Sequence, residues 1–246
     1  MPDLTFDTSI LTNTADLDPV SLDFPGLAPG ATGRTLRQVK DDLLRSVLVD
    51  LPAGWVSGAL VGQSEQQGYV LSGALSDGDT VLSAGTFFFH PAGHPFAWRC
   101  AEPVQLILVL IGPQIYQQAG DAAPRADAIV ALQPNDVAVT PSVVDGKASG
   151  VIRRVLWKDP QTGADTRHLT IPKGVSGLGA EWHPCNEEIY CLTREEVAGD
   201  QNGLCPGCFL FNPAFAVHGG KRSENLAETT LLEWHDGFWE IYRYTD

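Results

Sequence analysis

The chain has 246 residues, a length that suits two domains, each large enough to bury a core of its own. Its 30 acidic residues outnumber its 16 basic ones, and the formal net charge of −14 opposes binding to phosphate backbones and anionic lipids. We therefore expect neither nucleic acid nor a membrane as partner. The segment MPDLTFDTSILT lacks a basic start and a long apolar stretch, so we expect no signal peptide and a cytoplasmic location.

The composition predicts an all-β fold. Apolar residues make up 43% of the chain, and 25 glycines and 17 prolines supply the tight turns that many short strands require. Helical periodicity is weak throughout, and RTLRQVKDDLLRSV (34–47) is interpreted as strand, turn and strand. VQLILVLIG (104–112) is an apolar run of strand length, too short to cross a bilayer, and it predicts a fully buried strand.

Residues 1–34 form an extended arm ahead of the first candidate strand pair. The arm carries apolar residues that are too few to make a core, namely Leu17, Val20, Leu22 and Phe24. They suit pairing with an exposed sheet edge, which β-proteins must cover to avoid uncontrolled association. The edge belongs either to the second half of the same chain or to another copy.

Four segments of the first half recur in the same order, at nearly constant spacing, in the second half. We therefore predict two tandem copies of one unit, at residues 1–125 and 126–246, joined by a linker at 113–130. The pairs are GRTLRQV (33–39) with GVIRRV (150–155), LPAGWVSG (51–58) with IPKGVSG (171–177), GYVL (68–71) with IYCL (189–192), and GTFFFHP (85–91) with GCFLFNP (207–213).

The second copy presents a candidate metal site. His183 ends one predicted strand, Glu187 opens the next, and a later strand delivers His218. Two imidazoles and one carboxylate form the facial triad typical of non-haem Fe(II), and they also suit Zn, Mn or Ni. Glu181 lies two residues before His183 on a strand, hence on the same face, and is a candidate fourth ligand. Glu188 is the alternative to Glu187, although strand alternation turns it to the opposite face.

This pattern resembles the cupin superfamily. The first cupin motif is HxH followed by Glu, and the second is Gly, five residues, Pro and then His; Gly207, Pro213 and His218 match the second. The chain departs from the pattern in having Glu181 where the family has its first His, which puts the preferred metal in doubt. The likeness is to bacterial bicupins of unassigned function, and more loosely to cupin dioxygenases and to the ChrR-type cupin domain of anti-sigma factors.

The resemblance implies two tandem jelly-roll barrels and a metal-dependent enzyme. It favours a non-haem Fe(II) dioxygenase acting on a small oxygenated organic molecule. The alternatives are a non-enzymatic module that binds a metal or a small ligand, and a Zn or Mn isomerase, lyase or hydrolase. Because cupins commonly dimerise, it also favours a homodimer formed through the N-terminal arm.

The first copy lacks the ligand set and is expected to be degenerate. Gly62, Gln66 and Phe96 stand where the second copy has His183, Glu187 and His218. His90 and His94 offer a replacement pair, but the nearby carboxylate, Glu65, is one position out of register. We expect these histidines to line an apolar cavity or to bond a loop.

Further residues near the candidate site remain open between a functional and a structural role. His168 precedes the first motif and is either an additional ligand or a strand histidine with ordinary partners. Arg153 and Arg154 either anchor an anionic substrate or lie on a solvated strand face. We expect His235, near the last turn of the chain, to be exposed or capping.

The five cysteines are expected to be reduced, since the number is odd and no signal peptide precedes them. Cys205 and Cys208 form a CxxC, yet no second CxxC and no thioredoxin-like context accompany it, so we expect neither a redox nor a zinc role. Cys185 either borders the metal pocket or is a plain buried thiol.

Overall fold

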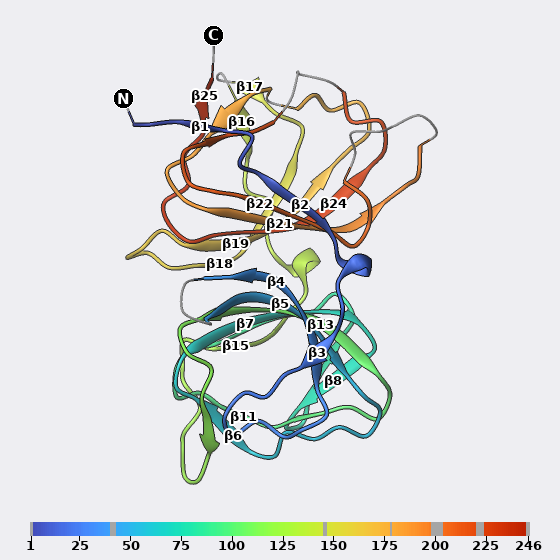
Figure 1. Cartoon of the computed structure of the whole chain (residues 1–246), viewed down its shortest axis with the longest axis vertical. Coiled ribbons are helices and arrows are strands. Elements are labelled where there is room, and N and C mark those ends of the chain that lie inside the picture. Colours follow the sequence, from blue (N-terminus) through green and yellow to red (C-terminus); the bar gives the residue numbers. More distant parts are fainter. Residues whose placement is uncertain are drawn as a thin grey trace. The chain divides into compact units, whose positions relative to one another are not determined.

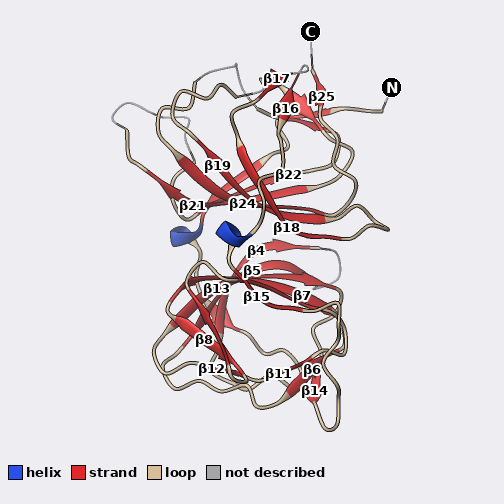
Figure 2. Cartoon of the chain, turned by 180° about the vertical axis from the view of Figure 1, so that it is seen from behind, coloured by secondary structure: helices blue, strands red, loops and turns tan. Residues whose placement is uncertain are grey.

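The computed structural model describes residues 2–39, 43–144, 147–177, 179–197, 204–219 and 224–244 (Figures 1 and 2). The chain forms two compact units. The N-terminal unit comprises Leu17–Asp136, and the C-terminal unit combines Met1–Asp16 with Val137–Asp246. The predicted all-β class is confirmed, because strands make up nearly all the regular structure of the described residues.

The boundaries of the N-terminal unit differ from those of the predicted first copy, residues 1–125. They differ both at its beginning and at its end. Residues 126–136 stay with the N-terminal unit because β15 (Ile129–Leu132) pairs with β10 (Phe87–His90). Residues 1–16 join the C-terminal unit because β2 (Ile10–Asn13) pairs with β22 (Cys208–Asn212).

A seven-stranded sheet with the order β15-β10-β7-β13-β5-β4-β3 forms the main layer of the N-terminal unit. Two three-stranded sheets, β11-β6-β14 and β12-β8-β9, complete it. The remaining strands of this unit are β3 (Val20–Ser21), β4 (Thr32–Gln38), β5 (Leu44–Leu51), β6 (Leu60–Gly62), β7 (Glu65–Ser72), β8 (Ala74–Asp77), β9 (Thr80–Ser83), β11 (Pro95–Phe96), β12 (Trp98–Arg99), β13 (Val104–Ile111) and β14 (Tyr116–Gln118), and a 3-10 turn spans Pro134–Asp136.

Two strand predictions for this unit match the structure. The apolar run 104–112 forms β13, which lies inside the sheet between β5 and β7 and is buried along most of its length. The segment 34–47 contributes to β4 and β5, which pair antiparallel; residues 40–42 of the predicted turn lie outside the described residues.

Phe96, which stands where the second copy carries His218, lies in a cluster of aromatic side chains inside the N-terminal unit. Phe96 and Tyr116 belong to the buried core, and Phe96 stacks on His90 with 5.5 Å between ring centres. His90 is buried, with Nε2 3.2 Å from Asp77 and Nδ1 3.4 Å from Gln66. His94 Nδ1 accepts a hydrogen bond from the backbone N–H of Arg125. Both histidines therefore have protein partners.

The C-terminal unit is built on a six-stranded sheet with the order β18-β19-β24-β21-β22-β2. Three pairs, β1-β23, β16-β17 and β20-β25, accompany it. The strands are β1 (Thr5–Phe6), β16 (Val143–Val144), β17 (Lys147–Ala148), β18 (Ile152–Lys158), β19 (Asp165–Ile171), β20 (Glu181–Trp182), β21 (Glu187–Arg194), β23 (Ala216–Val217), β24 (Thr229–His235) and β25 (Tyr242–Arg243), and a 3-10 turn spans Thr14–Asp16.

The N-terminal arm serves both units. Its first part adds β2 to the edge of the six-stranded sheet and pairs β1 in parallel with β23 (Figure 1). Its later part belongs to the N-terminal unit, where β3 pairs with β4 and Leu22 is buried in the core. Of the arm's apolar residues, Leu22 thus joins the core of the N-terminal unit and Phe24 packs against it, whereas Val20 is exposed on β3. Within the described residues, no helix has the length and apolar character that a membrane crossing requires.

Candidate metal centre

The inner face of the six-stranded sheet changes from polar to apolar in rows that run across the strands. The register aligns Asp165, His235, Glu187 and Asn212 in a first row. It aligns Arg167, Glu233, Ile189 and Leu210 in a second, and Arg153, Leu169, Leu231 and Cys191 in a third. Because side chains alternate along a strand, the residues between these rows face the other side of the sheet.

A cavity of about 720 Å³ lies against this inner face. Its polar end includes Glu181, Glu187 and His218. The rest of its wall is largely aliphatic, with Val151, Leu169, Ile171, Val175, Ile189, Leu210, Val217, Leu231 and Ile241. The sheet therefore positions a small polar centre at one end of an apolar chamber, as is common in ligand sites.

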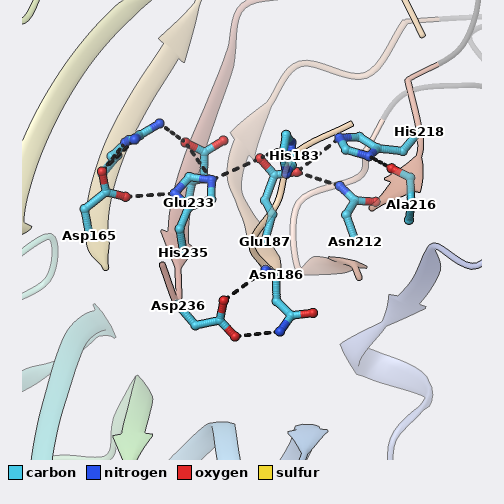
Figure 3. A network of polar contacts seen from close by, with 11 residues as sticks. Asp165, His183, Asn186, Glu187, Asn212, Ala216, His218, Glu233, His235 and Asp236 are labelled. Atoms are coloured by element: carbon cyan, nitrogen blue, oxygen red, sulfur yellow. Dashed lines mark hydrogen bonds and ion pairs between the residues drawn. The ribbon is translucent and has the colours of Figure 1, made fainter. Parts of the chain in front are cut away.

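The structure brings the three predicted ligands together (Figure 3). His183 follows β20, Glu187 begins β21, and His218 follows β23. Nε2 of His183 lies 3.6 Å from Oε1 of Glu187, and Nε2 of His218 lies 3.6 Å from Oε2. All three side chains are largely buried. One carboxylate thus faces two imidazole nitrogens across distances that leave room for an ion between them.

The protonation of His218 is set by its backbone. Nδ1 lies 2.9 Å from the carbonyl oxygen of Ala216, and since a carbonyl only accepts, Nδ1–H is the donor. Neutral His218 then carries its lone pair on Nε2, which is buried and has no hydrogen-bond partner. Such an orientation by a backbone carbonyl is usual for metal-binding histidines.

Glu181 joins these histidines. Its backbone N–H donates to the carbonyl oxygen of His218, and its carbonyl oxygen accepts a bond from the backbone N–H of His218, both at 2.9 Å. Glu181, His183 and His218 each offer a ligand atom within 4.8 Å of one another. Burial, and then the charge of Glu187, raise the pKa of Glu181 to about 8, and its Oε2 has no hydrogen-bond partner. A divalent cation bound beside Glu181 would favour the ionised form of this carboxyl group.

Burial also lowers the pKa of His183 to about 4, so this imidazole is neutral near pH 7 and free to bind a metal through a lone pair. The donor set therefore fits a divalent metal: two imidazoles, Glu187, and Glu181 as the fourth member, with buried ring nitrogens and a carboxylate oxygen that have no hydrogen-bond partner. Imidazole and carboxylate ligands suit Fe, Mn, Zn or Ni, and this set does not select among them.

Glu187 is held by hydrogen bonds to both carboxylate oxygens. Asn212 Nδ2–H donates to Oε2 at 2.6 Å, and Nε2 of His235 lies 3.2 Å from Oε1. Burial acts to raise the pKa of Glu187, but the bond from His235 and the charges of the neighbouring histidines hold it well below its usual range. Glu187 is therefore an anion in a fixed orientation.

The environment of His235 contradicts the expectation that it is exposed or capping. It is buried at the end of β24, with Nδ1 2.8 Å from Asp165 and Nε2 facing Glu187. Burial acts to lower the pKa of His235, but Glu233 and the bonds to Asp165 and Glu187 outweigh it and raise it to about 9. His235 thus donates through both nitrogens. It belongs, with Glu187 and Glu233, to a second group whose ligand atoms lie within 4.8 Å of one another.

Arg167 closes the network on the side away from His218. Its guanidinium donates to Asp165 Oδ2 at 2.6 and 2.9 Å and to Glu233 Oε2 at 3.5 Å. The Trp239 ring covers it, with 4.2 Å from Arg167 Cζ to the ring centre. Sequence reasoning missed these residues, although the alternation of Leu231, Glu233 and His235 in TTLLEWH was a signal for one strand face.

The other sequence candidates lie away from the centre. His168 is not an additional ligand in this geometry, because it falls between Arg167 and Leu169 on β19 and faces the opposite side of the sheet. Glu188 is likewise one residue out of step with Glu187 and pairs in register with Trp234. Cys185 is buried and is not part of the cavity wall.

Cys205 and Cys208 differ from the expectation of reduced thiols, because they form a disulfide. The bond lies just before β22, with Cys205 exposed and Cys208 buried. Cys100, Cys185 and Cys191 are free thiols.

The C-terminal half is thus an all-β unit with a buried His and carboxylate centre that faces a cavity. Residues 24–236 match the family described as a domain of unknown function (DUF4437), and the chain belongs to this family. No curated protein has a significant sequence match to the chain.

Solved structures confirm the jelly-roll fold of the cupins. A candidate dioxygenase of Nostoc punctiforme superposes with a TM-score of 0.82 at 19% identity, over 97% of this chain and 87% of that one. A candidate glyoxylate-induced protein of Pseudomonas aeruginosa gives a TM-score of 0.65 at 15% identity, covering 100% and 95%. The oxalate decarboxylase of Lactobacillus farciminis gives 0.57 at 12% identity, covering 99% and 89%. At these identities the likeness establishes the fold alone.

Proposed function

We propose that this protein is a metal-dependent cupin enzyme, a non-haem Fe(II) dioxygenase that acts on a small oxygenated organic molecule. The observation that carries the proposal is the convergence of His183, Glu187 and His218 at the polar end of the cavity. A bound Fe(II) would supply a Lewis acid that orients substrate and O2 and stabilises the developing anion.

The protein's own residues would perform the remaining tasks. His183, Glu187 and His218 would hold the ion and leave coordination positions open, with the Glu181 carboxyl group beside them. His235 and Asn212 fix the Glu187 carboxylate, and the Trp239 ring, 6.0 Å from that of His183, shields the centre from water. The aliphatic wall receives the carbon skeleton of the substrate.

The chain is further proposed to be a bicupin whose first copy has lost its site. The internal repeat supports this proposal. The aromatic core around Phe96, packed where the ligands would stand, supports it as well.

The first test is elemental analysis after aerobic expression with and without iron supplementation. We expect about one transition metal per chain, because only one copy carries the ligand set. Two equivalents of metal would show that the half with His90 and His94 also binds metal. A protein without metal would show that the ligand set has lost its function.

The second test is oxygen uptake by the iron-loaded protein with β-diketones, catechols and flavonols. Uptake that depends on both metal and substrate supports the dioxygenase. A metal that is retained with four protein ligands and no turnover would favour the alternative, a module in which the metal is structural. Turnover without oxygen consumption, with Zn or Mn bound, would favour an isomerase, lyase or hydrolase.

A further inference from the structure

Arg153 lies on the wall of the cavity in apolar surroundings. It stands on the edge strand β18, in the row that continues with Leu169 and Leu231. Its Nη2–H donates to the carbonyl of Pro141 at 2.8 Å, whereas its Nε is buried and has no hydrogen-bond partner. The side chain therefore presents a partly unsatisfied cation to the cavity.

The neighbouring carboxylates do not neutralise this charge. Asp165 and Glu233 are bound by Arg167, and no carboxylate of the described residues lies within ion-pair distance of Arg153. Burial, and then the charge of Arg167, lower the pKa of Arg153 from its ordinary value. The Arg153 side chain is half-buried, and its buried Nε–H lacks an acceptor, so the site favours a ligand that brings an anion.

Trp239 connects Arg153 with the candidate metal centre. The centre of its ring lies 6.0 Å from Arg153 Cζ and 6.0 Å from the centre of the His183 ring. Its Nε1–H is buried and has no hydrogen-bond partner. Two unsatisfied donors, one on Arg153 and one on Trp239, thus border the same cavity as Glu187.

We propose that the cavity selects a carboxylate whose apolar carbon skeleton carries an oxygenated group at its far end, with Arg153 as the anchor of the carboxylate. The skeleton lies on Leu169 and Leu231, and the far end points to the centre formed by His183, Glu187 and His218. The role of the far end rests on the proposed function, but the anchor does not. A phosphate is a poorer fit, because its second charge calls for more donors than one uncompensated guanidinium supplies.

The test measures binding of hexanoate and of its neutral counterpart hexanamide by calorimetry, in metal-free and in metal-loaded protein. We expect hexanoate to bind both forms, and Arg153→Gln to weaken it at least about tenfold, as the loss of a charge-assisted hydrogen bond implies. Hexanamide binding should change little. Arg153→Lys should recover part of the affinity, because it restores the charge without the planar fork.

Arg154→Gln is the matched control. Arg154 follows Arg153 on β18 and faces the other side of the sheet, beside His168, so its loss should leave hexanoate binding unchanged. The proposal fails if wild-type protein does not bind hexanoate at millimolar concentration, if Arg153→Gln binds it as wild type does, or if Arg154→Gln is equally damaging. Thermal unfolding of each variant shows whether a loss reflects misfolding; in that case Arg153→Lys decides.

The same experiment separates this proposal from the proposed function. If hexanoate binds through Arg153 but the protein retains no metal, the role of Arg153 is supported and the proposed metalloenzyme is contradicted. If a metal-loaded Arg153→Gln variant takes up oxygen with the wild-type KM, the proposed enzyme is supported and the role of Arg153 as anchor is contradicted.

Discussion

Four charged or polar side chains surround the carboxylate of Glu187, and each has a distinct task. His183 and His218 face it from the metal side, while Asn212 and His235 donate to its two oxygens. A carboxylate with both oxygens fixed keeps one orientation when the metal leaves. Metal exchange at this centre should therefore require little rearrangement of the protein.

Substitution of the ligands separates binding from folding. His183→Ala and His218→Ala should abolish metal retention while the chain stays folded, and Glu187→Gln should weaken retention far more than Glu188→Gln. The reason is that Glu187 faces the cavity whereas Glu188 faces the other side of the sheet. Metal content after gel filtration and circular dichroism are the two measurements. A larger loss in Glu188→Gln would place the first motif one residue out of register.

His235 acts through Glu187 as a positioning residue. We expect His235→Asn to weaken metal affinity roughly 10- to 100-fold, the usual effect of removing a partner that orients a ligand. His168→Gln is a matched control, because His168 lies on the neighbouring strand with its side chain on the opposite face. Equal metal dissociation constants in His235→Asn and wild type would mean that Asn212 alone orients Glu187.

His168 should affect stability in acid. Burial, and then the charge of Arg154, lower its pKa from 6.5 to about 4. The folded state therefore keeps His168 neutral, whereas in the unfolded chain this residue binds a proton below pH 6.5. The contribution of His168 to the free energy of unfolding is full above pH 6.5 and is lost as the pH falls toward 4. In metal-free protein, the urea midpoint of His168→Gln should fall less between pH 7 and 4.5 than that of wild type. Equal decreases of the urea midpoint in the two proteins would contradict the lowered pKa of His168.

The grouping of the three candidate ligands could be predicted from sequence because they sit in two short motifs at fixed spacing. The residues that orient them could not, because their contacts join strands far apart in the chain. Asp165, for example, meets His235 across a separation of 70 residues. The expectation for His235 rested on its nearness to the chain end, but it is the last residue of a strand whose register fixes its direction.

At the scale of the elements, β1 and β2 complete the wall of the metal-binding unit. β2 pairs with β22, which carries Asn212, and β1 pairs with β23, which leads to His218. Asp7 and Ser9, between these strands, line the cavity. The all-β class and the strand β13 followed from composition and apolar runs. For the arm, the sequence left open whether it pairs with the second half of the chain or with another copy, because a short strand carries no signal for a partner so distant in sequence.

Deletion of residues 2–13 should destabilise the C-terminal unit and promote aggregation. It removes β1 and β2 and exposes the backbone edge of β22, a template for association. Calorimetry should show a lower transition temperature, and light scattering should show aggregates. Deletion of residues 2–4, which precede β1, is the control and should behave as wild type. An unchanged transition after the longer deletion would show that the pairing contributes nothing.

At the scale of the whole molecule, we predict a homodimer formed through the arm. β2 is the edge strand of its sheet, and its residues Ile10 and Leu11 are 57% and 59% exposed despite being apolar. Two such edges can pair around a two-fold axis. Light scattering at micromolar concentration should give twice the chain mass of 26.5 kDa, and Ile10→Lys with Leu11→Lys should give the monomer. A full-length protein that is already monomeric would end the idea.

The placement of β2 also has a consequence for synthesis on the ribosome. Residues 17–136 form one continuous insertion between the first two strands of the C-terminal unit and the rest of that unit. β2 is made early, but its partner, Cys208–Asn212, emerges only near the end of translation. The inserted unit can fold in the meantime, which shortens the loop that β2 must close. In a nascent chain halted before residue 208, the N-terminal unit can be folded while β2 still lacks the strand with which it pairs.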